Sequence, residues 1–118
     1  MGGLVVGGKF SRDKGARGER QTANELQEGC PLTITRGVGQ TQDGSDTADV
    51  EGVECIHFEV KSQKRGNPRA ALKQADEAAA PGRIPVAVIR DTRKRAFVSM
   101  YWDDFLDLWR EYWEIKNL

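Results

Sequence analysis

Apolar and polar residues alternate along residues 54–62, ECIHFEVKS, as they do in a β-strand with one buried face. Successive side chains of a strand point to opposite faces, so Glu59 and Lys61 share one face and the apolar residues share the other. A second candidate strand, TADVEG, covers residues 47–52, and Gly52 allows the chain to reverse between the two. The pattern therefore predicts a β-hairpin with a carboxylate and an amine side by side on one face.

Similar patterns along the rest of the chain predict an α/β fold. The predicted elements are a helix over 11–30 with Ser11 as its N-cap, strands over 32–36, 84–90 and 95–101, a helix over 69–80 that opens at Asn67-Pro68, and a final helix within 101–118. Residues 37–45 are predicted to form a loop, and residues 1–10, MGGLVVGGKF, a flexible or loosely docked arm. This order is typical of a small single domain over 1–118 in which helices flank a mixed central β-sheet.

The final predicted helix is rich in aromatic residues. Its apolar positions form one broad stripe that contains Trp102, Phe105, Leu106, Trp109, Tyr112 and Trp113. Most of this stripe is expected to pack in the core, but three tryptophans exceed what a small core easily buries. The exposed part is expected to contact a second copy of the chain in a homodimer.

Charge is segregated along the chain although the formal net charge is zero. Residues 37–60 contain six acids and no lysine or arginine, residues 61–75 contain five basic residues and no acid, and residues 9–20 and 90–95 are mainly basic. An acidic pocket between basic segments suits an enzyme that holds a cation and acts on a polyanion. Mixed surface charge explains the pattern equally well when charge alone is considered.

Neither a membrane nor an oxidising compartment is indicated by the sequence. No stretch reaches the roughly 18 apolar residues of a membrane-spanning helix, and the first ten residues do not resemble a signal peptide. The two cysteines lack Cys-x-x-Cys spacing, so reduced thiols inside the cell are the default expectation. We therefore expect no membrane partner and a cytoplasmic location.

Metal-assisted hydrolysis of a phosphodiester is a chemistry that the predicted hairpin can support. One or two carboxylates can hold Mg²⁺, which activates a water and neutralises the phosphate. Asp49 and Glu59 lie on adjacent predicted strands and can converge, and the carbonyl of Val60 can add an oxygen ligand. Lys61, about 6.6 Å from Glu59 along the strand, can orient the attacking water or stabilise the phosphate. An ordinary solvated strand face is the alternative, which the spacing alone favours.

The basic segments on both sides of the hairpin are predicted to contact DNA phosphates. The predicted contacts are Lys14, Arg17 and Arg20 on the first helix, and Lys64, Arg65 and Arg69 after the hairpin. Phosphate contacts position DNA without reading its sequence, which suits recognition of DNA shape. A solvated surface is the alternative role of these residues.

Four short motifs, KGARGER, TRGVG, ADV and FEVKS, give the chain a resemblance to a known family. Their order and spacing resemble those of the archaeal-type Holliday junction resolvases of the PD-(D/E)xK nuclease superfamily, versions of which phages carry. The resemblance covers roughly residues 12–90. It implies a restriction-endonuclease-like fold and a small endonuclease that uses Mg²⁺, for which Mn²⁺ can substitute. It also implies a homodimer acting on four-way DNA junctions, in the host cytoplasm if a phage encodes it.

The resemblance implies roles for individual residues. Glu19 matches the acid of the first-helix motif and would contact the metal directly or through water. Asp49 matches the metal-binding aspartate, and Glu59 and Lys61 match the Glu-x-Lys pair. The implied catalytic residues are therefore Glu19, Asp49, Glu59 and Lys61.

The family pattern also implies supporting residues. Arg20 matches a basic residue that supports the site or contacts the backbone. Arg36 matches the arginine that ends the first strand, and it is expected to contact DNA. Gln74 occupies the next helix, where related nucleases place a polar residue, and a surface role is its alternative.

Two positions depart from the family pattern. Ala48 stands where a proline usually precedes the motif aspartate, which leaves Asp46 as a second candidate metal ligand beside Asp49. Gln40 stands where some relatives place a serine near the scissile phosphate. Any catalytic hydroxyl would then come from elsewhere, with Thr41 and Ser45 as candidates.

The leading hypothesis is an endonuclease that resolves four-way junctions by paired nicks and leaves 5′-phosphate and 3′-hydroxyl ends. One alternative is a related nuclease that acts on duplex, flap or nicked DNA. Another is a non-catalytic DNA-binding module in which the acids form a structural network.

Overall fold

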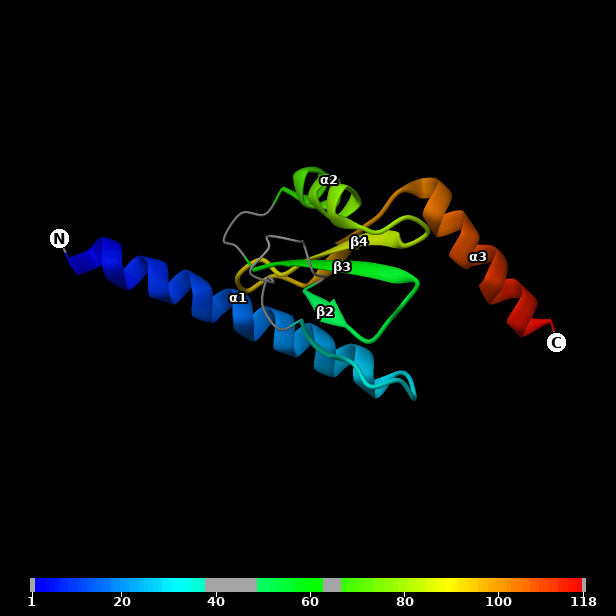
Figure 1. The fold of residues 1–118 in the computed structure, drawn as a ribbon, viewed down its shortest axis with the longest axis horizontal. Helices are drawn as coiled ribbons and strands as arrows, with labels where there is room; N and C mark the ends of the chain where they lie inside the picture. The colour runs from blue at the N-terminus through cyan, green and yellow to red at the C-terminus, as the bar shows by residue number, and fades with distance from the viewer. Residues whose placement is uncertain (1, 38–48, 63–66, 118) are drawn as a thin grey trace.

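The computed structural model describes residues 2–37, 49–62 and 67–117. The elements, shown in Figure 1, are α1 (Gly2–Glu28), β1 (Thr35–Arg36), β2 (Val50–Glu51), β3 (Ile56–Lys61), α2 (Pro68–Ala78), β4 (Ile84–Ile89), β5 (Phe97–Ser99) and α3 (Trp102–Lys116). The strands form one sheet in the order β1-β2-β3-β4-β5. β3 and β4 pair in parallel through the α2 crossover, and the other neighbours pair antiparallel. The mixed sheet, the α/β class and the β2–β3 hairpin are therefore as predicted.

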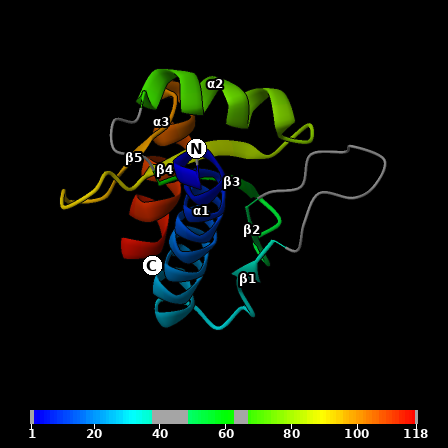
Figure 2. The ribbon, with the colours of Figure 1, turned by 90° about the vertical axis from the view of Figure 1, so that its left-hand side faces the viewer.

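Two buried apolar clusters lie on opposite faces of the sheet. Figure 2 shows α1 and α2 on opposite sides of the sheet, so that each covers one face. Val86 of β4 belongs to the cluster that contains Ala23 of α1. Its neighbour Ala87 belongs to the cluster that contains Leu72 of α2. Because adjacent strand residues point to opposite faces, α1 and α2 cover opposite faces of the sheet.

The start of α2 is also as predicted. Asn67 has extended backbone angles, and its Oδ1 accepts a hydrogen bond of 3.1 Å from the backbone N–H of Ala70. Pro68 follows as the first helical residue, where its missing N–H costs nothing. Because β3 and β4 are parallel, α2 must run back along the sheet, which places its first turn near the C-terminal end of β3.

The helix α1 is longer than predicted. It begins at Gly2, so residues 2–10, expected to form a flexible or loosely docked arm, continue the helix, and Ser11 lies within the helix instead of capping it. Adding residues to an existing helix carries no new nucleation cost, and no proline interrupts residues 2–28. Figure 1 shows the N-terminal part of α1 extending beyond the sheet. None of the helices in the described ranges is long and apolar enough to cross a membrane.

The first strand is shorter than the predicted range of 32–36. The side chain of Gln27 on α1 accepts a hydrogen bond of 2.7 Å from the N–H of Ile34 and donates one to the carbonyl of Leu32. These backbone groups are thus bonded to a helix side chain instead of to a neighbouring strand. Regular pairing is left to Thr35 and Arg36.

The expectation that most of the α3 aromatic stripe packs in the core is wrong. None of the fifteen residues of α3, all within the described part of the chain, is buried. Trp102 is 70% exposed and Trp109 is 48% exposed. Figure 1 shows why: α3 leads away from the sheet, so its stripe has little of the chain to pack against.

The turn between β2 and β3 depends on a glycine. Gly52 has a φ of 112°, and a Cβ there would overlap the carbonyl oxygen of Thr33. We expect Gly52→Ala to lower the free energy of unfolding by roughly 3 kcal/mol, from backbone strain plus overlap. Gly82→Ala is the matched control because Gly82 has a φ of 86° but open space around it. It should cost about 1 kcal/mol. Urea unfolding measures both, and equal losses would contradict this assignment.

Candidate functional site

The strand face that carries Glu59 is buried. Glu59 is 6% exposed and His57 on the same face is 1% exposed. Glu59 pairs with Ala87 of β4, whose side chain packs under α2, so this face looks toward α2. Taking a carboxylate out of water is costly unless it is paired, hydrogen-bonded or bound to a metal. An ordinary solvated strand face is therefore the wrong interpretation of this alternation.

Asp49 lies opposite Glu59 across the hairpin. Val50 pairs with Phe58, which places the preceding residue beside Glu59 in the antiparallel register. The backbone N–H of Asp49 donates to the carbonyl of Phe58 at 2.9 Å. Asp49 Oδ2 accepts a hydrogen bond of 2.7 Å from the N–H of Val60. The hairpin thus fixes both the backbone and the carboxylate of Asp49 against β3, although Asp49 and Glu59 are ten residues apart.

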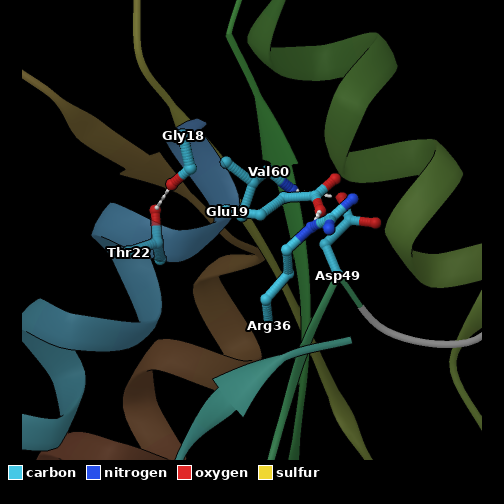
Figure 3. Close-up of polar contacts among 6 residues, drawn as sticks. All are labelled: Gly18, Glu19, Thr22, Arg36, Asp49 and Val60. Carbon is cyan, nitrogen blue, oxygen red and sulfur yellow. Dashed lines mark hydrogen bonds and ion pairs between the residues drawn. The ribbon is translucent and has the colours of Figure 1, made fainter. Parts of the chain in front are cut away.

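Glu19 reaches the same place from α1. Its Oε2 accepts a hydrogen bond of 2.6 Å from Nε of Arg36, forming an ion pair. Figure 3 shows Glu19, Arg36 and Asp49 pointing toward one another beside Val60. The sequence suggested separate roles for Glu19 at the metal and Arg36 on DNA. The structure instead joins them, so that Arg36 positions the Glu19 carboxylate next to Asp49.

The backbone of β3 adds a possible oxygen ligand. The carbonyl of Lys61 accepts a hydrogen bond of 2.8 Å from the N–H of Arg90, next to β4. Carbonyl directions alternate along a strand, so the carbonyl of Val60 points to the opposite side, toward β2 and Asp49. The bond from the Val60 N–H to Asp49 agrees with this direction.

The donor set fits a hard divalent cation. Within residues 2–37, 49–62 and 67–117, no three His, Cys, Asp or Glu side chains form a metal-binding group. Mg²⁺ does not require one, because it commonly binds one or two carboxylates and keeps several waters. Asp49, Glu59 and the Val60 carbonyl would supply oxygen ligands of that kind, and Glu19 would lie beside them.

Some of the other predicted site residues lie in the described part of the chain, and the rest lie outside it. Lys61 is half-buried at the end of β3, while Arg20, Arg69 and Gln74 are exposed on their helices. Arg69 is in the first turn of α2 and so lies toward the same end of the sheet as Lys61. Gln40, Asp46, Lys64 and Arg65, with Thr41 and Ser45, lie outside the described residues.

Polar contacts that sequence reasoning missed hold α1 against the sheet. Nε of Arg90 donates to the hydroxyl of Thr22 at 2.7 Å, that hydroxyl donates to the carbonyl of Gly18 at 2.7 Å, and Arg90 also pairs with Glu25. Arg90 had been predicted only as part of a basic cluster. A Cβ on Gly18 would overlap the hydroxyl of Ser62, so this glycine lets α1 approach the end of β3. The second glycine of KGARGER, Gly18, was the available signal.

Substitutions at Asp49 should separate structure from chemistry. Asn retains an oxygen that can accept the Val60 N–H, so we expect Asp49→Asn to change the free energy of unfolding by less than about 0.5 kcal/mol. Asp49→Ala removes the acceptor and should cost about 1–3 kcal/mol. The nuclease activity that the sequence predicts should be lost in both variants, because neither has the negative charge that would hold a cation. Urea unfolding and a nuclease assay measure the two effects, and full cleavage by Asp49→Asn would remove Asp49 from the metal site.

Comparison with known proteins finds no matching family model, no matching curated protein and no matching solved structure. What the site can do follows from its own residues. Two acidic residues, Asp49 and Glu59, lie opposite each other in the hairpin register, an amine follows on the same strand as Glu59, and Glu19 of α1 lies beside Asp49.

Proposed function

We propose that the chain is a Mg²⁺-dependent, structure-selective DNA endonuclease that resolves four-way junctions by paired nicks. The observation that carries this proposal is Asp49 held opposite the buried Glu59, with Lys61 two residues further along the same strand. The four sequence motifs support a restriction-endonuclease-like nuclease of the PD-(D/E)xK superfamily. Because its proposed substrate is DNA, the enzyme would work inside a cell.

The residues have distinct roles in the proposed reaction. Asp49, Glu59 and the Val60 carbonyl would hold Mg²⁺ or Mn²⁺, which when bound supplies an acidified water and neutralises phosphate charge. The Lys61 ammonium orients the attacking water or stabilises the charge that develops on the phosphate. Glu19, positioned by Arg36, supports the site directly or through water. Attack in line with the leaving 3′-oxygen gives 5′-phosphate and 3′-hydroxyl ends.

Cations near the site would hold the DNA backbone. Arg20 on α1 and Arg69 at the start of α2 are exposed and can reach phosphates without disturbing the fold. Lys64 and Arg65, between β3 and α2 in sequence, are proposed to act in the same way. Contacts of this kind fix the position of DNA and leave recognition to the shape of the junction.

A homodimer would present two sites to the two strands that must be cut. Along the α3 stripe, neighbouring aromatic rings are stacked or meet edge to face. These rings belong to Trp102, Phe105, Trp109, Tyr112 and Trp113. Five half-exposed aromatic side chains leave on the order of 500 Å² of ring surface. That area approaches the roughly 800 Å² that each partner contributes to a standard interface. We propose that α3 of a second copy covers it.

The charges of α3 favour an antiparallel pair. Its first turn carries Asp103 and Asp104, Asp107 follows, and Lys116 lies in its last turn. Burial raises the pKa of the Asp104 carboxyl, and three neighbouring carboxylates raise it further, so negative charge is already crowded there. A parallel pair would bring two such acidic ends together. An antiparallel pair places the acidic end of one helix beside Lys116 of the other, in agreement with two-fold symmetry.

A substrate panel tests this function. Labelled four-way junction, matched duplex and flap DNA are incubated with the protein in Mg²⁺ or in EDTA. Paired nicks in the junction alone, and only with Mg²⁺, are the expected result. Cleavage of all substrates would indicate a general nuclease of the same superfamily. Binding without cleavage would indicate a DNA-binding module whose acids are structural.

A further inference from the structure

A cleft of about 510 Å³ lies between α1 and the segment that joins β4 to β5. Its walls include Lys14, Arg17 and Gly18 of α1, Ser62 after β3, and Arg90 and Lys94 beyond β4. The volume is that of a site for a nucleotide-sized group, larger than a lone ion requires. Nζ of Lys14 donates a hydrogen bond of 2.7 Å to Oγ1 of Thr92, which ties α1 to the β4–β5 segment and fixes the cleft.

The lining of the cleft is cationic. It contains four basic side chains and two acids, Glu25 and Asp91. Glu25 is engaged by Arg90, so that acid already has a positive partner. Arg17 and Lys94 form no salt bridge within the described residues. Their charge is therefore available to an anionic ligand.

The segment opposite α1 keeps a cation in a strained position. Arg93, next to Lys94, has a φ of 60°, in the left-handed region that residues with a Cβ rarely adopt. Glycine would fill this position with less strain. An arginine held there, beside Lys94 and Arg95, agrees with a segment built to present positive charge.

The cleft lies at the same end of the sheet as the proposed active site, on the side that α1 covers. Ser62, which lines it, directly follows β3, and the N–H of Arg90, another lining residue, donates to the carbonyl of Lys61 at 2.8 Å. A DNA strand whose scissile phosphate lies at Glu59 and Lys61, on the α2 side, would reach the cleft by crossing this end of the sheet, and its next phosphates would then follow α1 and the β4–β5 segment. Arginine and lysine side chains that lead away from such a site would bind the regularly spaced phosphates of a DNA backbone.

We propose that this cleft binds the phosphodiester backbone of the DNA strand that runs on from the scissile phosphate, with Arg17 and Lys94 as its main contacts. The proposal rests on the proposed function for the direction of the strand. It does not depend on catalysis, because phosphate binding requires neither the metal nor the carboxylates.

Binding measured in EDTA tests the cleft separately from cleavage. The full chain, Arg17→Ala/Lys94→Ala and the control Lys73→Ala are titrated with four-way junction over a range of salt concentrations. Lys73 is an exposed cation on α2, on the opposite face of the sheet. We expect the double variant to bind at least about tenfold more weakly. The slope of the logarithm of its binding constant against the logarithm of the salt concentration should become shallower by nearly one unit for each lost phosphate contact, roughly two in all. The control should bind like the parent.

The outcomes distinguish the two proposals. A double variant with the affinity and salt slope of Lys73→Ala would overturn the cleft proposal, even if Mg²⁺-dependent cleavage were intact. Equal weakening by Lys73→Ala would overturn it as well, because the effect would then be general charge. Weaker binding by the double variant alone would support the cleft, even if the parent proved unable to cleave DNA.

Discussion

Replacing Glu59 with glutamine is expected to reduce Mg²⁺-dependent cleavage at least roughly 100-fold and to leave DNA affinity almost unchanged. Glutamine has nearly the same shape and can still form hydrogen bonds at this buried position. It lacks the negative charge that a divalent cation requires. The variant should also fold like the parent, since glutamine fills nearly the same space in the core. Single-turnover cleavage, binding in EDTA and thermal unfolding measure the three effects.

The matched control is Glu51→Gln, an exposed carboxylate on β2 of the same hairpin. It should cleave at the parent rate. Lys61→Ala should lose cleavage while retaining most of its DNA affinity, because its proposed task is in the reaction step. Unchanged cleavage by Glu59→Gln, or equal losses in Glu59→Gln and Glu51→Gln, would remove the hairpin from the proposed active site.

Introducing two acids into the aromatic stripe, Trp109→Glu/Trp113→Glu, is expected to convert the proposed dimer into a folded monomer. Removing the interface rings and adding like charges on both copies should weaken association by at least roughly 1,000-fold, as expected when two central aromatic contacts are lost. The fold should survive, because these side chains are exposed within the single chain. Analytical ultracentrifugation measures the dimer, and circular dichroism with thermal unfolding checks the fold.

Ile115→Glu is the control for this experiment. Ile115 is exposed on the same helix but lies outside the stripe, so the same kind of change should leave the dimer intact. A parent chain that is monomeric at high concentration, or a double variant that still dimerises, would contradict the α3 pair. If the double variant binds junctions but cuts one strand at a time, the dimer is what couples the two nicks.

Local chemistry allowed several elements to be predicted from the sequence. The alternation in ECIHFEVKS and the glycine before it identify the hairpin, because strand period and turn conformation depend on adjacent residues. Asn67-Pro68 identifies the start of α2 because a cap involves a side chain and a backbone amide three residues away. These features need no knowledge of the rest of the fold.

Features that depend on distant contacts were not predictable in the same way. The first strand was shortened by Gln27, a residue of α1, and the ion pair of Glu19 with Arg36 joins residues of different elements. The stripe on α3 was identified correctly by helical periodicity, but periodicity cannot tell which surface covers it. The burial of Glu59 likewise depends on α2 passing over the strand, and that burial is what makes an ordinary solvated face the wrong interpretation.

Cleavage of a labelled four-way junction under single-turnover conditions, with the product ends identified, tests metal-dependent hydrolysis most directly. The protein is first treated with EDTA, and Mg²⁺ is then restored to the parent and to Glu59→Gln. Paired nicks with 5′-phosphate and 3′-hydroxyl ends should appear with the parent on addition of Mg²⁺ and be absent in EDTA and with Glu59→Gln. Equal cleavage in EDTA, equal cleavage by Glu59→Gln, or binding with no cleavage by the parent would contradict the proposed site.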